Sequence, residues 1–125
     1  MSGEDLLSYQ EIVREIPVAE PVVRYAVRLT AATRPEGNGK VLDFIRDYVS
    51  WGASIRGSHY LVVAAKARAI LDGRFNVGVG DIQAVARPVL RHRITTNFRA
   101  ESTHVGAEDI IEKLLEAVPP PDINL

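Results

Sequence analysis

The chain has 125 residues, with 15 Lys and Arg against 16 Asp and Glu, so its formal net charge at pH 7 is −1. It contains no cysteine, which excludes disulfides and thiolate metal sites, and it has no long uncharged apolar run or basic leader, which argues against a membrane span or a secretory signal. We therefore expect a cytoplasmic protein of one domain, residues 1–125, large enough to bury a core without crosslinks.

Apolar residues recur at helical spacing along most of the chain, which predicts an all-α fold. The first such segment, LLSYQEIVREI, ends at Pro17, and the second, AEPVVRYAVRLTAATR, has Pro21 near its start, where a helix tolerates proline. After the loop PEGNGK, residues 41–49 (VLDFIRDYV) fit either a helix or a strand, and we favour the helix.

The longest predicted helix begins after Ser54, which we expect to be its N-cap residue. It ends near Leu71, and Gly73 is suited to follow the C-cap. Apolar residues cover a wide part of its surface, so we expect a central helix that several neighbours contact.

Two further helices and a tail complete the predicted fold. The segment DIQAVARPVLRHR has near-ideal helical spacing with a bend expected at Pro88, and AEDIIEKLLEAV has Glu108 and Asp109 in its first turn, where the helix dipole favours acidic residues. Residues 119–125 are expected to form an extended tail. The sequence thus predicts a compact bundle of about five or six helices.

Charge is unevenly distributed along the chain. Residues 51–100 hold eight basic residues but only Asp72 and Asp81, whereas the flanking segments are acidic. This excess fits an anionic partner, either a nucleotide phosphate or a nucleic acid, but the same side chains can instead pair with the acidic flanks after folding. The eight are Arg56, Lys66, Arg68, Arg74, Arg87, Arg91, Arg93 and Arg99.

Motifs for independent chemistry are missing from the sequence. There is no G-x-x-x-x-G-K-[ST] phosphate loop, and the G-x-G at Gly78 and Gly80 lacks the strand and further glycine of a dinucleotide site. His59, His92 and His104 are too scattered for a local metal site, and no serine lies in a G-x-S-x-G turn. We expect no metal site and no catalysis by this chain alone, and a core or interface position for His59.

Arg56 occupies an unfavourable place, the first turn of a helix, where the dipole disfavours a cation by roughly 0.3–1 kcal/mol. A helix N-terminus already offers free N–H groups to an anion, and a guanidinium next to them would strengthen a phosphate site. The alternative is an exposed arginine paired with a neighbouring carboxylate. The local pattern leaves both open.

The order of three segments resembles a known family. GASIRGSHYLVVAAKARAILDGR, then DIQAVARPVLRHRI, then NFRAE before an acidic amphipathic helix are similar to the C-terminal lid of MoxR-type AAA+ ATPases. Lids of this family carry a GAS-P-R-A helix start, an alanine-rich helix and a P-V-L-x-H-R segment. The resemblance extends from Gly52 to about Val118, and it implies a helical bundle of the AAA+ lid type from which the core ATPase domain is absent.

The resemblance also implies a role for Arg56. In this family the arginine of the GAS-P-R motif is the second sensor, which reaches the γ-phosphate from the lid, so Arg56 is the expected nucleotide-binding residue and Gly52, Ala53 and Ser54 the supporting helix start. It would report hydrolysis as movement of the lid. ATP and magnesium are then expected in the full-length parent, which would be the ATPase, with neither bound by this chain alone.

The partners implied by the resemblance are the core AAA+ domain of the same protein, neighbouring subunits of a hexamer, and a protein with a von Willebrand factor A domain. The implied task is that of a chaperone in protein maturation or metal-cofactor insertion. The sequence departs from the family at Ile55, where proline is usual, and at Gly78-Val79 and Gly106-Ala107, which replace Ser/Thr-Pro and predict weaker helix caps.

Two other functions compete with the lid. One is a small nucleic-acid-binding module that uses a basic helix over residues 81–99 and offers Arg87, Arg91 and Arg93 to phosphates, although Pro88 and the modest overall charge weaken it. The other is a protein-interaction bundle without a nucleotide role, which would use the wide apolar face of the helix over residues 54–72.

Overall fold

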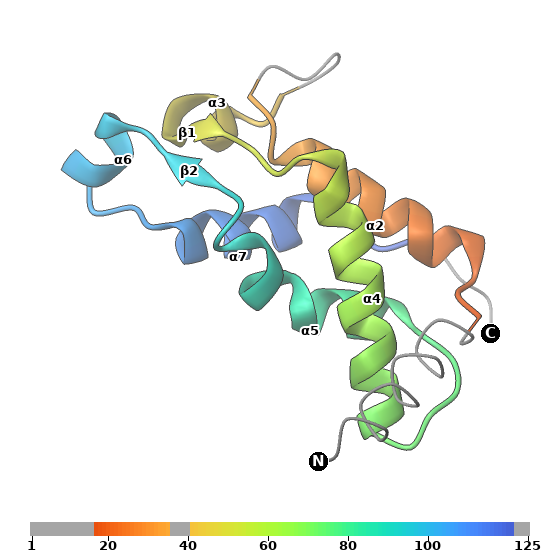
Figure 1. Ribbon diagram of the computed structural model, residues 1–125. Coiled ribbons are helices and arrows are strands. Elements are labelled where there is room, and N and C mark those ends of the chain that lie inside the picture. Colours follow the sequence, from red (N-terminus) through yellow and green to blue (C-terminus); the bar gives the residue numbers. More distant parts are fainter. Residues whose placement is uncertain (1–16, 36–40, 122–125) are drawn as a thin grey trace.

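A computed structural model describes residues 17–35 and 41–121 of the chain. Six helices and one small two-stranded sheet make up this part, which confirms the all-α prediction (Figure 1). The predicted first helix, LLSYQEIVREI, lies outside the described residues. The elements are α2 (Glu20–Ala32), α3 (Asp43–Tyr48), β1 (Val49–Trp51), α4 (Ile55–Leu71), α5 (Val79–Leu90), β2 (Thr95–Thr96), α6 (Phe98–Ser102) and α7 (Ala107–Ala117).

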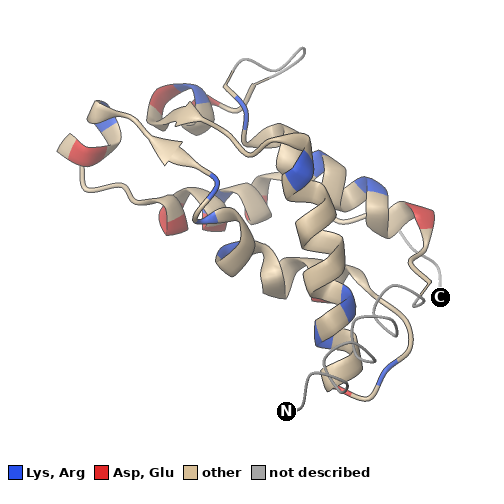
Figure 2. Cartoon of the chain, viewed as in Figure 1, with Lys and Arg blue, Asp and Glu red and all other residues tan. Residues whose placement is uncertain are grey.

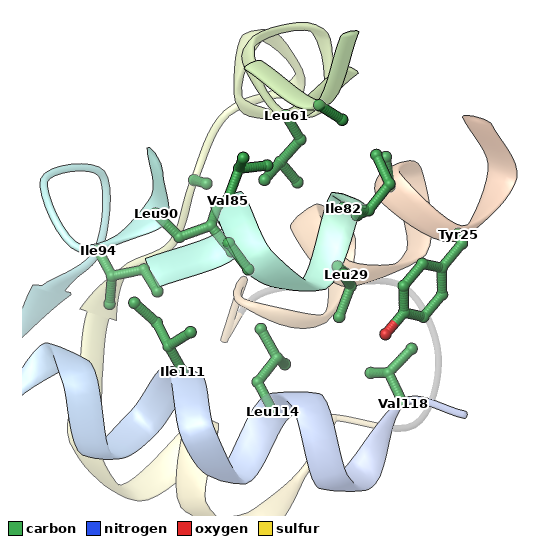
Figure 3. Packing of buried hydrophobic residues seen from close by; sticks show 14 of the residues in the cluster. Tyr25, Leu29, Leu61, Ile82, Val85, Leu90, Ile94, Ile111, Leu114 and Val118 are labelled. Carbon is green, nitrogen blue, oxygen red and sulfur yellow. The ribbon is translucent and has the colours of Figure 1, made fainter. Parts of the chain in front are cut away.

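The core lies between α2, α4, α5 and α7. Figure 3 shows α5 between α4 and α7, with Leu61 of α4 directed toward α5 from one side and Ile111 and Leu114 of α7 directed toward it from the other. Ile82 and Leu90 of α5 are completely buried between these layers. The helix α5 therefore lies between two others, and the longest helix, α4, which we expected several neighbours to contact, packs on both α2 and α5.

Only one side of α4 is buried. Leu61, Ala65 and Ala69 face α2 and α5 and are inaccessible to solvent, whereas Tyr60 and Leu71 are 45% and 79% exposed. The wide apolar surface read from the sequence thus combines a core-facing stripe with a solvent-facing one.

Residues 41–49 divide between a helix and a strand. The helix α3 ends at Tyr48, and β1 then pairs antiparallel with β2, with Val49 opposite Thr96 and an irregularity in register before Trp51. The favoured helix was therefore correct only over Asp43–Tyr48. Val49 is buried, and its β-branched side chain suits the pleated position that it occupies.

The two ends of α4 differ in how well the sequence predicted them. At the C-terminal end, Gly73 has φ 75°, and the N–H groups of Gly73 and Arg74 donate to the carbonyls of Ile70 and Ala69 at 2.9 and 2.8 Å. These two bonds form a Schellman motif, in which glycine is favoured because its φ is positive. The C-terminal prediction is confirmed.

At the N-terminal end, Ser54 is the N-cap residue, but its side chain accepts no capping hydrogen bond, which corrects the predicted role of its hydroxyl. The N–H of Gly57 instead donates to the backbone carbonyl of Ser54 at 2.8 Å, so this donor is already satisfied. The sequence therefore predicted correctly which residue is the N-cap, but not which group accepts the hydrogen bond there.

Two helix starts with glycine caps are reinforced from inside the helix. The Asp81 carboxylate accepts from the N–H of Gly78 at 2.9 Å at the start of α5, and Asp109 accepts from Gly106 at 2.9 Å at the start of α7. In a capping box the N3 side chain bonds the N-cap N–H and the N-cap side chain bonds the N3 N–H. Glycine has no side chain, so only the first of these bonds can form here. These bonds compensate for the weaker caps expected at both positions.

The helix that contains Pro88 is displaced relative to its prediction. It begins at Val79 and ends at Leu90, so the segment RHR lies beyond it, where the chain turns to bury Ile94 and to pair β2 with β1. Of the predicted tail over residues 119–125, residues 119–121 lie outside helices and strands, and the rest is outside the described residues. None of the described helices has the length and hydropathy needed to cross a membrane.

Candidate functional site

The segment before α4 is anchored on the end of α2. The N–H of Ala53 donates to the buried Thr33 Oγ1 at 2.8 Å, and Thr33 Oγ1 donates in turn to the carbonyl of Thr30 at 2.6 Å. Arg34 Nε donates to the Ala53 carbonyl at 2.9 Å. Both backbone groups of Ala53 are therefore bound to the C-terminal end of α2, which fixes the direction in which α4 begins.

Two glycines allow this close approach. A Cβ atom on Gly52 would lie 2.3 Å from the Thr33 carbonyl oxygen and 2.7 Å from Arg34 Cα, distances that no real side chain adopts. A Cβ on Gly57 would lie 3.1 Å from Ala53 Cβ and 3.2 Å from a methyl group of Thr30, again tighter than ordinary contact. The requirement at Gly52 is steric, because its neighbours are backbone atoms that cannot move aside.

Arg56 extends from this fixed helix start into solvent. It is exposed, and it forms no ion pair or side-chain hydrogen bond with any residue in the described ranges. The first turn of α4 has no acidic residue to compensate it. The alternative of a neighbouring carboxylate partner is thus not what residues 17–35 and 41–121 show, and the guanidinium is available to a ligand.

Five other arginines of the basic segment do have carboxylate partners, which for three of them come from the acidic flanks, as the alternative reading predicted, and for two come from within the segment. Arg87 and Arg91 pair with Glu112 and Glu108 on the acidic helix α7, at 3.7 and 3.2 Å, and Arg99 approaches Asp47 at 3.9 Å. Arg68 and Arg74 pair with Asp81 and Asp72. Figure 2 shows basic residues along α4 and acidic residues on α7.

Asp81 forms the most buried of these ion pairs and ties the end of α4 to the start of α5. It is 2% exposed, and it accepts from Arg68 Nη1 at 2.7 Å and from Arg74 Nη1 at 2.9 Å, besides the N–H of Gly78. The hydrogen bond from Arg74 outweighs the opposing effect of burial and lowers the pKa of Asp81 to about 2. Asp81 is therefore ionised at neutral pH and has a structural role.

The structure lacks the basic helix over residues 81–99 on which the nucleic-acid-binding alternative relied. Residues 81–99 do not form one helix, because α5 ends at Leu90 and β2 follows. Arg87 and Arg91 pair with glutamates of α7, and Arg93 extends toward α4 over the ring of Tyr60, so the three arginines do not form one row along a helix.

Histidine does not assemble a site in the described part of the chain. His59 is exposed and contacts the ring of Tyr60 edge-on, with 6.0 Å between ring centroids, so of the two expected positions the one in the core was wrong and the one at an interface stays a prediction. Across residues 17–35 and 41–121, no group of three or more His, Asp or Glu side chains is placed to hold a metal ion.

The sequence did not indicate Thr33 or Arg34, and it indicated Arg93 only as a phosphate contact of the nucleic-acid-binding alternative. Thr33 and Arg34 act across about 20 positions of sequence, and Arg93 across more than 30. Local spacing cannot reveal such contacts. The only available signal was the basic RHR segment, which was assigned to the helix before it.

The comparison with known families decides what kind of domain carries this site. Residues 44–114 match the family model described as the AAA lid domain. The chain belongs to the AAA lid domain family. The lid is 35% identical to chaperone MoxR1 of Mycobacterium tuberculosis over 125 residues, which is 99% of this chain and 33% of that protein.

Two further relatives agree with this assignment. Protein MoxR of Methylorubrum extorquens is 38% identical over 108 residues, 82% of this chain and 32% of that protein. A crystal structure of a candidate ATPase from Cytophaga hutchinsonii superposes with a TM-score of 0.85 at 30% identity, over 95% of this chain and 36% of that one. The lid is of the MoxR type, and it spans about a third of the length of the curated relatives it matches.

Proposed function

We propose that this lid closes over a nucleotide held by the core domain of a MoxR-type ATPase, and that Arg56 contacts the γ-phosphate as the second sensor. The observation that carries the proposal is an exposed arginine without a carboxylate partner in the described residues, on the first turn of a helix that is fixed to α2. The N–H groups at a helix N-terminus and a guanidinium both favour a phosphate ligand.

Coupling to lid movement follows from how Arg56 is attached. Phosphoryl transfer is catalysed mainly by positioning and by stabilising charge, so an arginine on the γ-phosphate loses its ligand when the bond is cleaved. Ala53 and Gly52 join the start of α4 to α2 through backbone contacts. We therefore propose that release of the phosphate turns the lid as a rigid body.

The cofactors and partners of the parent are part of the same proposal. ATP and Mg²⁺ would be bound in the core domain, where Mg²⁺ neutralises phosphate charge, and this chain, as one lid domain over residues 1–125, would contribute Arg56. Homology to a protein named chaperone MoxR1 supports a chaperone task, for which we propose protein maturation or metal-cofactor insertion. We further propose a hexamer, a partner with a von Willebrand factor A domain, and the cytoplasm, which supplies ATP.

The test is the ATP turnover of the full-length parent with Arg56→Ala. Removal of one charged hydrogen-bonding group at a phosphate costs about 1.5–3 kcal/mol, so turnover should fall by about tenfold to a hundredfold while the melting temperature of the lid stays constant. Arg24→Ala is the matched control, because Arg24 is an exposed arginine paired with Glu20 on α2. Turnover of Arg56→Ala equal to that of this control would refute the sensor role.

A further inference from the structure

Arg93, the last residue of the segment PVLRHR, has a position that the sensor role of Arg56 does not explain. Its side chain leaves the turn after α5 and lies across the beginning of α4. Nη1 donates to the Val89 carbonyl at 3.0 Å, the guanidinium carbon is 4.2 Å from the centre of the Tyr60 ring, and Cδ is 3.8 Å from the Cβ position of Gly57. Three contacts thus direct one arginine onto the first two turns of α4.

The face of α4 that Arg93 covers is the one that carries Arg56. Tyr60 follows Arg56 by four residues, and residues four apart in a helix lie above one another on the same face. Gly57, which has no side chain, leaves room for the stem of Arg93 to pass. Arg56 and the ring on which the Arg93 guanidinium lies are therefore attached to the same face of α4, one turn apart.

The charge on this surface is uncompensated within the described residues. Of the eight basic residues between positions 51 and 100, the five arginines described above have a carboxylate within 4.0 Å. Arg56, Arg93 and Lys66 have none there, and Lys66 lies ten residues beyond Arg56, about 15 Å along the helix. Two arginines beside the positive end of a helix dipole repel each other, and an anion bound to both would relieve that repulsion.

We infer that Arg93 is a second phosphate-binding arginine, which joins Arg56 on the terminal phosphate of the nucleotide that the parent's core holds; the inference rests on the function proposed above. Contact with the face of the Tyr60 ring orients the guanidinium without occupying its N–H groups. The Val89 carbonyl accepts from one of its five donors, so the others remain available for phosphate oxygens.

The experiment measures equilibrium binding of a non-hydrolysable ATP analogue and of ADP to the full-length parent. Arg93→Ala should weaken binding of the analogue by about tenfold or more and that of ADP much less, because only the analogue has the terminal phosphate. Tyr60→Leu removes the aromatic ring that the Arg93 guanidinium contacts, so it should show part of this loss of analogue binding. Tyr60→Phe keeps the ring and should bind the analogue as wild type does. Arg91→Ala is the matched control, since Arg91 pairs with Glu108 and faces α7.

Three outcomes decide the inference. An ATP-selective loss for Arg93→Ala that Tyr60→Leu shares in part would support it. The inference would be overturned if Arg93→Ala bound both nucleotides as the Arg91→Ala control does, or if it lost affinity for both equally. If Arg93→Ala does not fold, the comparison of Tyr60→Leu with Tyr60→Phe gives the same decision. Arg56→Ala measured in parallel separates the two proposals, because the sensor role can fail while the ATP-selective effect of Arg93 persists, and the reverse.

Discussion

Gly52→Ala is the most informative change at the helix start, because it tests the contact that holds Arg56 in place. The new Cβ would lie 2.3 Å from the oxygen and 2.5 Å from the carbon of the Thr33 carbonyl, and 2.7 Å from Arg34 Cα. All three are backbone atoms at the C-terminal end of α2. The clash can be relieved only if the segment before α4 moves away from α2.

The cost has two parts. Overpacking a tight contact costs typically about 1–3 kcal/mol, and the same movement removes the hydrogen bond from the Ala53 N–H to Thr33 Oγ1, leaving a buried donor without a partner at about 1–3 kcal/mol. The free energy of unfolding should therefore fall by about 2–5 kcal/mol. For a chain of this length such a loss lowers the melting temperature by about 8–20 °C.

Thermal unfolding followed by circular dichroism measures this loss, and Gly80→Ala is the matched control. Gly80 lies in the first turn of α5, and a Cβ there would meet no atom within 4 Å, so alanine should stabilise the chain by up to about 1 kcal/mol. In the parent, Gly52→Ala should also reduce ATP turnover, because it displaces the helix that carries Arg56. A Gly52→Ala chain that melts within about 2 °C of wild type would refute the steric argument.

Three other predictions concern the opposite end of α4. Asp81→Asn should destabilise the chain by about 2 kcal/mol, because Arg68 and Arg74 lose a buried carboxylate. Asp109→Asn, at the equivalent but exposed position of α7, should cost less than about 1 kcal/mol. Chemical denaturation at pH 7 would measure both changes. Because the pKa of Asp81 in the folded state is lowered from 3.8 to about 2, its contribution to the free energy of unfolding is present above pH 4 and is lost as the pH falls toward 2. The wild type should therefore lose stability over this range, and Asp81→Asn should lose less. Parallel curves of stability against pH would contradict the structural role of the Asp81 carboxylate. Gly73→Ala should cost about 1 kcal/mol, since φ is 75° there, and an unchanged melting temperature would contradict that reasoning.

Local sequence information was sufficient for most of the helices. Helical spacing of apolar residues and glycine at the end of α4 depend on neighbours within a few positions, and both were predicted correctly. The boundary between α3 and β1 was not, because Val49 forms a strand only when β2 arrives from almost 50 residues away. The pairing of β1 with β2, and not the local sequence, determines where the helix ends and the strand begins.

The candidate site was predicted less completely than the fold. Arg56 was found from an electrostatic anomaly and a family resemblance, but whether it had a carboxylate partner depended on which acidic residues the fold brings near. The same uncertainty applied to the other arginines, and it was resolved when α7 placed its glutamates beside Arg87 and Arg91. Thr33 and Arg93 act on α4 from distant positions, so no local pattern could reveal these two contacts.

The central claim is that Arg56 contacts the terminal phosphate, and a structure of the full-length parent with Mg²⁺ and a non-hydrolysable ATP analogue tests it most directly. The account predicts a guanidinium nitrogen of Arg56 about 2.7–2.9 Å from a γ-phosphate oxygen, the distance of a charge-assisted hydrogen bond. An Arg56 paired instead with a carboxylate of the core, or directed into solvent away from a fully bound nucleotide, would contradict it.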